Sequence, residues 1–106
     1  MILTTTNKID GKSIIHYHSI VTGETIIGAN FIKDIFASFT DFFGGRSRTY
    51  EKVLIEAKNE ALKTLERKAA LQRANAVVGI SFSYQTIGRK QSMLMVSASG
   101  TAVTIE

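Results

Sequence analysis

One long segment with helical periodicity constrains the fold of this chain more than any other feature. Between residues 49 and 74, apolar side chains recur at spacings of three and four, and charged residues fill the positions between them. The apolar stripe consists of Tyr50, Val53, Leu54, Ala57, Ala61 and Leu65. The pattern predicts an amphipathic helix near residues 49–74, with Ser47 or Thr49 as its N-cap and Asn75 at its end. We expect this helix to pack on a sheet.

Two segments after the predicted helix alternate between apolar and small residues, as strands do. Val78, Ile80 and Phe82 are expected on one face of the first strand, and Leu94 and Val96 on the same face of the second. The Gly-Arg-Lys-Gln sequence at residues 88–91 predicts the turn of a β-hairpin. The hairpin's apolar face is expected to meet the helix layer.

The second face of this hairpin is rich in serine and carries no charge. Solvated strand faces usually carry charged side chains, which also prevent unwanted association. We therefore expect this face, or a strand edge beside it, to contact another subunit. The alternative is a hydroxyl-rich face covered only by water.

Shorter elements are expected before the long helix. Residues 2–6 and 13–21 have the composition of strands, and the Asp-Gly pair at residues 10–11 indicates a turn between them. The apolar residues 25–27, placed between Gly23 and Gly28, suggest another short strand. A second apolar stripe predicts a shorter amphipathic helix from Asn30 to Gly44; its members are Ile32, Ile35, Phe36, Phe39 and Phe43.

Together these elements predict one two-layer α/β (α+β) domain over residues 1–106. It is expected to have an antiparallel sheet with one long and one shorter helix on one face. The length of 106 residues suits a single domain.

Composition excludes several kinds of site. The chain has no cysteine, which excludes disulfides, thiolate metal sites and a cysteine nucleophile. Its N-terminus lacks the basic and apolar blocks of a signal peptide, and its longest uncharged runs are shorter than the roughly 20 residues of a membrane span. The sequence therefore predicts a soluble, cytoplasmic protein without a membrane partner.

The net charge of +4 arises between residues 46 and 75, where eight basic residues face four acidic ones. A basic helix can attract nucleic acid. Here the two signs are interleaved, and no aromatic residues lie among the charges to stack on bases. A solvated helix face is the better interpretation, and nucleic acid is not an expected partner.

The sequence GGRSR is a candidate anion-binding or nucleotide-binding loop. It contains Gly44, Gly45, Arg46, Ser47 and Arg48. The start of a helix presents unpaired N–H groups, and the arginines could add charge-assisted hydrogen bonds to a phosphate or carboxylate. The segment matches neither phosphate-binding glycine motif. The alternative is a simple joint between two helices, with arginines that pair with a glutamate or a neighbouring subunit.

A pair of histidines in the first long strand is the candidate metal site. His16 and His18 are two residues apart, so their side chains leave the same face of a strand. Two imidazoles can bind one Zn²⁺, Ni²⁺ or Cu²⁺, but a firm site needs a third ligand from Glu24, Asp34, Asp41 or another subunit. The alternative is two ordinary strand histidines. No motif predicts a catalytic residue.

Four stretches of the sequence resemble the YbjQ-like family of small bacterial proteins. They are VTGETIIGANFIKDIF, GGRSRTYEKVL, ANAVVGISFSY and SMLMVSASGTAV, and together they extend over nearly the whole chain. The resemblance implies a compact α/β subunit, similar to a dodecin subunit, assembled into a homopentameric ring. It implies no established activity. The family's label suggests heavy-metal binding, which only His16 and His18 could serve in this sequence.

These observations predict a small, non-enzymatic, homo-oligomeric binding or structural module, with five subunits by resemblance. Its ligand is not identified by the sequence. One alternative is a heavy-metal-binding protein that uses His16 and His18, for which a divalent metal ion would be the cofactor. The other is an anion- or nucleotide-binding module at the Gly44 to Arg48 segment.

Overall fold

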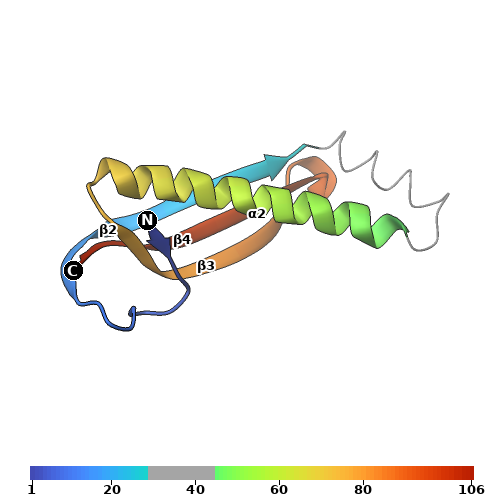
Figure 1. The fold of residues 1–106 in the computed structure, drawn as a ribbon. Helices are drawn as coiled ribbons and strands as arrows, with labels where there is room; N and C mark the ends of the chain where they lie inside the picture. The colour runs from blue at the N-terminus through green and yellow to red at the C-terminus, as the bar shows by residue number, and fades with distance from the viewer. Residues whose placement is uncertain (29–44) are drawn as a thin grey trace.

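The computed structural model describes residues 1–28 and 45–106, which form a sheet with one long helix lying across a single face (Figure 1). The elements are β1 (Ile2–Leu3), β2 (Ile14–Ile27), α2 (Gly45–Leu71), β3 (Ala76–Ile87), a 3-10 turn η1 (Arg89–Gln91) and β4 (Met93–Ile105). The strand order is β1-β3-β4-β2. The predicted two-layer α+β class is confirmed. The shorter helix predicted from Asn30 onward lies outside the described residues.

Three of the four strands form the predicted antiparallel arrangement. Strand β4 lies in the middle and pairs antiparallel with both β2 and β3. The short β1 is the exception, because it pairs parallel with the start of β3. The hairpin predicted between β3 and β4 is present, with η1 as its connection.

Helix α2 packs on the sheet through the predicted stripe. Ala57, Ala61 and Leu65 are buried, and the stripe continues to the buried Ala69. Val53 and Leu54 are half-buried against β2 and β4. The sheet residues buried in the main cluster under the helix are Val21, Val77, Ile80, Ala98 and Ala102. Small side chains dominate both sides, so the helix lies close to the strands.

Gly23 marks the closest approach of helix and sheet. A Cβ atom at this position would collide with the carbonyl oxygen of Ala61 and would lie 2.8 Å from the backbone nitrogen of Leu65. The prediction of a separate short strand at residues 25–27 is wrong, because β2 is continuous from Ile14 to Ile27. The glycine is needed because the helix backbone occupies the space of its side chain.

The end of α2 also differs from the prediction. The left-handed residue is Arg73, with φ of 64°, and not Asn75. The N–H of Ala74 donates to Ala69 C=O at 3.1 Å and the N–H of Arg73 donates to Ala70 C=O at 3.0 Å, which is the Schellman pattern. Asn75 has another role. Its side-chain amide donates to Ile105 C=O at 2.9 Å, and its side-chain oxygen accepts from Ile105 N–H at 2.7 Å.

A β-bulge in β3 corrects the predicted division of its residues between the two faces. Val78 pairs with Thr101 but Ser81 pairs with Ser99, so β3 has one residue more than β4 in this interval. Gly79, with φ of 64°, lies at this point. Consequently Val77 and Ile80 face the helix, whereas Val78 belongs to a cluster on the opposite face. The predicted grouping of Val78 with Ile80 and Phe82 is wrong.

Within residues 1–28 and 45–106, the opposite face of the sheet is covered only near the chain termini. There a small buried cluster joins Ala76, Val78, Val103 and Ile105, with Ile9 and Ile14 packed against it. The N-terminal segment also hydrogen-bonds to the bulge, because Gly79 N–H donates to Thr6 C=O at 2.8 Å and Ile80 N–H to Thr4 C=O at 3.1 Å. No described residue forms a second layer over the rest of this face (Figure 1).

Candidate functional site

The two histidines of β2 lie together, as their spacing predicts. The ring centroids of His16 and His18 are 4.5 Å apart, with the planes at 75°, so one ring meets the other with its edge. His16 is exposed and His18 is half-buried. The Nε2 atom of His18 is 2.7 Å from the hydroxyl oxygen of Thr104 on β4. This hydrogen bond fixes the orientation of the second imidazole.

The histidine pair does not fit a complete metal site within one chain. Firm zinc sites use three or four protein ligands. Among residues 1–28 and 45–106, no group of three or more histidine, aspartate or glutamate side chains is placed to hold a metal ion. One ring nitrogen of His18 is already engaged with Thr104. Of the suggested third ligands, Glu24 does not join the pair, while Asp34 and Asp41 lie outside the described residues.

The Gly-Gly-Arg-Ser-Arg segment lies at the start of the long helix. Gly44 is outside the described residues, and α2 begins at Gly45. Ser47 and Thr49 therefore lie within the helix and do not precede it as caps, so that part of the prediction is wrong. The backbone of Gly45, Arg46, Ser47 and Arg48 forms the first helical turn, whose N–H groups have no partners within the helix. Anion binding by this turn stays a prediction.

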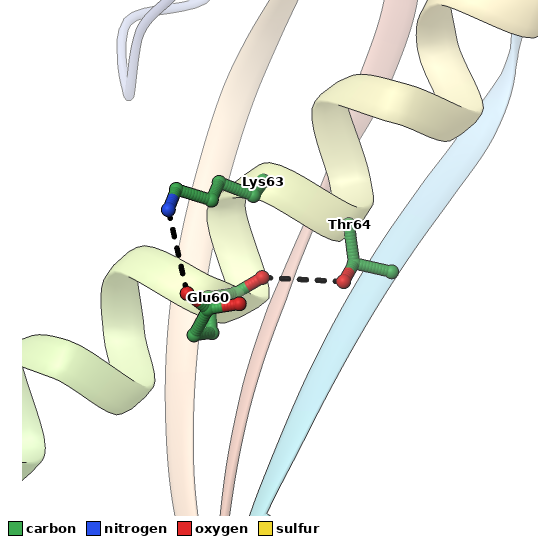
Figure 2. Close-up of polar contacts among 3 residues, drawn as sticks. All are labelled: Glu60, Lys63 and Thr64. Carbon is green, nitrogen blue, oxygen red and sulfur yellow. Dashed lines mark hydrogen bonds and ion pairs between the residues drawn. The ribbon is translucent and has the colours of Figure 1, made fainter.

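The outward side of α2 is a mixed-charge surface. Lys63 Nζ lies 3.4 Å from Glu60 Oε1, and the hydroxyl of Thr64 donates to the Glu60 carbonyl at 3.2 Å (Figure 2). Both charged side chains are more than 60% exposed, so this pair contributes at most about 1 kcal/mol to stability. The interleaved charges are typical of a solvated helix face.

The uncovered face of the sheet is the most unusual surface of the described chain. We define it as the outward residues of three strands: Ile20, Thr22, Glu24 and Ile26 on β2, Met95, Ser97, Ser99 and Thr101 on β4, and Ser81, Ser83 and Gln85 on β3. Strands β3 and β4 contain no charged residue, and β2 contains only Glu24 besides its two histidines. The predicted uncharged second face of the hairpin is confirmed for β3 and β4, whereas β2 adds Glu24 and two exposed isoleucines to this surface.

Two features make this uncovered face suited to contact with another protein surface. Its serines pair with one another, because the hydroxyl oxygens of Ser81 and Ser99 are 3.3 Å apart and Ser83 bonds to Ser97 in the same way. Hydroxyls that satisfy each other lose less when water is removed. Beside them, Ile20 is 78% exposed and Ile26 is 57% exposed. Apolar side chains therefore border a polar but internally bonded centre.

No helix in the described part of the chain has the length and apolar character needed to cross a membrane.

Comparison with known proteins connects this geometry to a family. Residues 1–106 match the family model YbjQ_1, whose description is "Putative heavy-metal-binding". UPF0145 proteins of Clostridium kluyveri, Clostridium botulinum and Acetivibrio thermocellus are 55%, 54% and 51% identical to this chain over 106 residues. For each of these three relatives, the match covers 100% of both chains.

A solved structure has a similar fold. It is the crystal structure of a protein of unknown function from the DUF74 family of Pediococcus pentosaceus, with a TM-score of 0.59 and 18% sequence identity. The match covers 100% of this chain and 98% of that one. At this identity the likeness supports the α+β fold and nothing further.

Proposed function

This chain belongs to the YbjQ-like family, and from that premise we propose that it is a self-assembling, non-enzymatic binding or structural module of the cytoplasm. The observation that carries this proposal is the uncovered sheet face. The three relatives above are named only as UPF0145 proteins, and none has the name of an enzyme.

The energetics of the uncovered face favour a protein partner over water. Burying one isoleucine side chain contributes about 1.5–3 kcal/mol relative to leaving it exposed. Ile20 and Ile26 lie on this face at high exposure, and Glu24 on β2 is the one charged residue that would be buried with them. A second copy of the chain offers the same surface, on which Glu24 is the one charged residue. The expected number of five subunits comes from the family resemblance alone.

Native mass spectrometry of the untagged protein at low micromolar concentration tests this proposal. We expect a homo-oligomer, with five subunits as the specific expectation. The same spectrum would reveal a metal ion or small molecule that remains bound. A species of 11.6 kDa, the mass of one chain, would overturn the proposal. A dimer or hexamer would overturn only the number five.

Heavy-metal binding is the second candidate function, favoured by the contact between the rings of His16 and His18 and by the family description. We expect the isolated protein to bind Zn²⁺ only weakly at this pair, because it offers two imidazoles and one of them is bonded to Thr104. Calorimetric titration with Zn²⁺ of the wild type and of the His16→Ala/His18→Ala variant tests this. Submicromolar binding that is lost in the variant would place metal binding ahead of assembly.

A further inference from the structure

Two stretches of strand edge have no partner strand among the described residues. Strand β2 is the last strand of the sheet, and no described residue pairs with its outer edge. On the other side, β1 and the residues after it cover only the beginning of β3. The last hydrogen bond on this side is donated by the N–H of Ile80 to Thr4 C=O. Beyond it, no strand within residues 1–28 and 45–106 pairs with the outer edge of β3 at residues 81–87.

The two open edges are regular and unprotected. Residues 20–27 of β2 and residues 81–87 of β3 each pair with β4 without a register shift. Exposed edges are normally protected by lysine, proline or bulges. Neither stretch contains lysine or proline. The two stretches together contain one charged residue, Glu24 of β2. The two register shifts in β2 lie before Ile20, outside this regular stretch.

The geometry of the sheet makes these edges complementary to each other. Both β2 and β3 are antiparallel to β4, so they run in the same direction. Glu24 of β2 and Ser83 of β3 are at the same position along the strand direction, because both pair with Ser97 of β4. A copy of the chain rotated about an axis along the strands would therefore bring its β3 edge beside β2, with the two strands parallel.

We propose that residues 20–27 of β2 pair in parallel with residues 81–87 of β3 in the next subunit, so that the sheet continues around a closed ring. This inference rests on the proposed self-assembly and specifies its contact. A ring formed in this way uses both edges of every subunit and leaves neither open. An antiparallel dimer through two β2 edges would leave both β3 edges exposed, and an added foreign peptide would leave one edge exposed.

Engineered disulfides provide the test, because the chain has no cysteine of its own. The double variant Glu24→Cys/Ser83→Cys places both thiols on the uncovered face of the sheet. Within one subunit β4 separates these strands by about 9–10 Å, too far for a disulfide. Oxidation should therefore join only neighbouring subunits and give a series of covalent species that ends at the ring size. Thr22→Cys/Ser83→Cys and Ile26→Cys/Ser83→Cys cover a register shift of two residues in either direction.

Matched controls separate this contact from other ones. Glu24→Cys/Tyr84→Cys should cross-link much less, because Tyr84 is on the helix side of β3, next in alternation to Phe82. The single variants Glu24→Cys and Ser83→Cys should give no covalent dimer. A covalent dimer from either single variant would indicate pairing of like edges and would overturn the proposal.

Sedimentation of the reduced variants distinguishes the two levels of the inference. An assembled protein in which none of the three pairs cross-links would overturn the parallel edge contact and leave self-assembly intact. A monomeric wild type would overturn both. Loss of assembly in the reduced Glu24→Cys/Ser83→Cys variant, with a helix-face variant such as Arg67→Cys still assembled, would support the edges as the contact.

Discussion

The two faces of the sheet use the same three long strands in opposite ways. The helix-covered face places alanine, valine and glycine under α2, where Ala61, Leu65 and Val96 are fully buried. The uncovered face places paired serines at its centre and leaves Ile20 78% exposed. Glu24 is the one charged strand residue on the uncovered face, and only the helix-covered face has a partner layer within the described chain. The difference teaches that a scarcity of strand charges does not by itself tell whether a sheet face is covered within its own subunit.

The largest effect is expected in the covered face. Leu65→Ala should lower the free energy of unfolding by about 2–5 kcal/mol, because it leaves a cavity in a fully buried site. Leu54→Ala should cost less, since Leu54 is only half-buried. Leu71→Ala, at an 81% exposed position of the same helix, is the control and should change stability by less than about 0.5 kcal/mol. Denaturant unfolding at one fixed subunit concentration measures all three.

Gly23→Ala tests the close approach of the two layers and should cost about 1–3 kcal/mol. The added methyl group would meet backbone atoms of Ala61 and Leu65, which cannot rotate away as a side chain can. Gly28→Ala is the matched control, because a Cβ atom there has no neighbour within 4 Å in the described chain. Equal stability of the two variants by denaturant unfolding would show that the helix does not lie as close as described.

Asn75→Ala should have a smaller effect, about 1–2 kcal/mol, through the loss of two hydrogen bonds to the backbone of Ile105. This residue ties the segment after α2 to the end of β4, so hydrogen exchange at Ile105 should accelerate. Asn59→Ala on the exposed side of α2 serves as the control. Unchanged exchange at Ile105 in Asn75→Ala would contradict this role.

The smallest effect on subunit stability and the largest on assembly are expected in the uncovered face. Ser97→Glu should change the unfolding free energy of the subunit by less than about 1 kcal/mol, because the position is on the outer side of the sheet. It should shift the oligomer toward smaller species where the uncovered face itself is buried between subunits, because the added charge would then lose its water. Asn59→Glu adds the same charge on the helix and should leave the sedimentation profile unchanged. An unchanged profile for Ser97→Glu as well would place the contact at the strand edges alone.

The sequence predicts the parts of this fold that depend on periodicity. Spacings of three and four identify α2, and alternation identifies the hairpin of β3 and β4. It cannot locate the bulge at Gly79, the contact of Gly23 with α2, or the left-handed Arg73, because each depends on which backbone or strand lies opposite. The joining of residues 13–21 and 25–27 into one strand could not be predicted for the same reason, since it depends on pairing with β4.

The candidate sites divide in a similar way. The spacing of His16 and His18 predicts that their rings are neighbours, but not the hydrogen bond between His18 and Thr104, which depends on the pairing of β2 with β4. The lack of charged residues in the sequences of β3 and β4 predicts the serine-rich face of the hairpin. The two open edges could not be predicted, because strand order is a property of the whole sheet and leaves no periodic signal in one strand.

Sedimentation equilibrium of the untagged wild-type chain at low micromolar concentration tests most directly whether the uncovered face is completed by other subunits. We predict a stable homo-oligomer whose mass is a whole-number multiple of 11.6 kDa, with five subunits as the specific expectation, and no detectable single chain. A single species of 11.6 kDa that persists as the concentration is raised would contradict this explanation, because the uncovered face would then be stable in water alone.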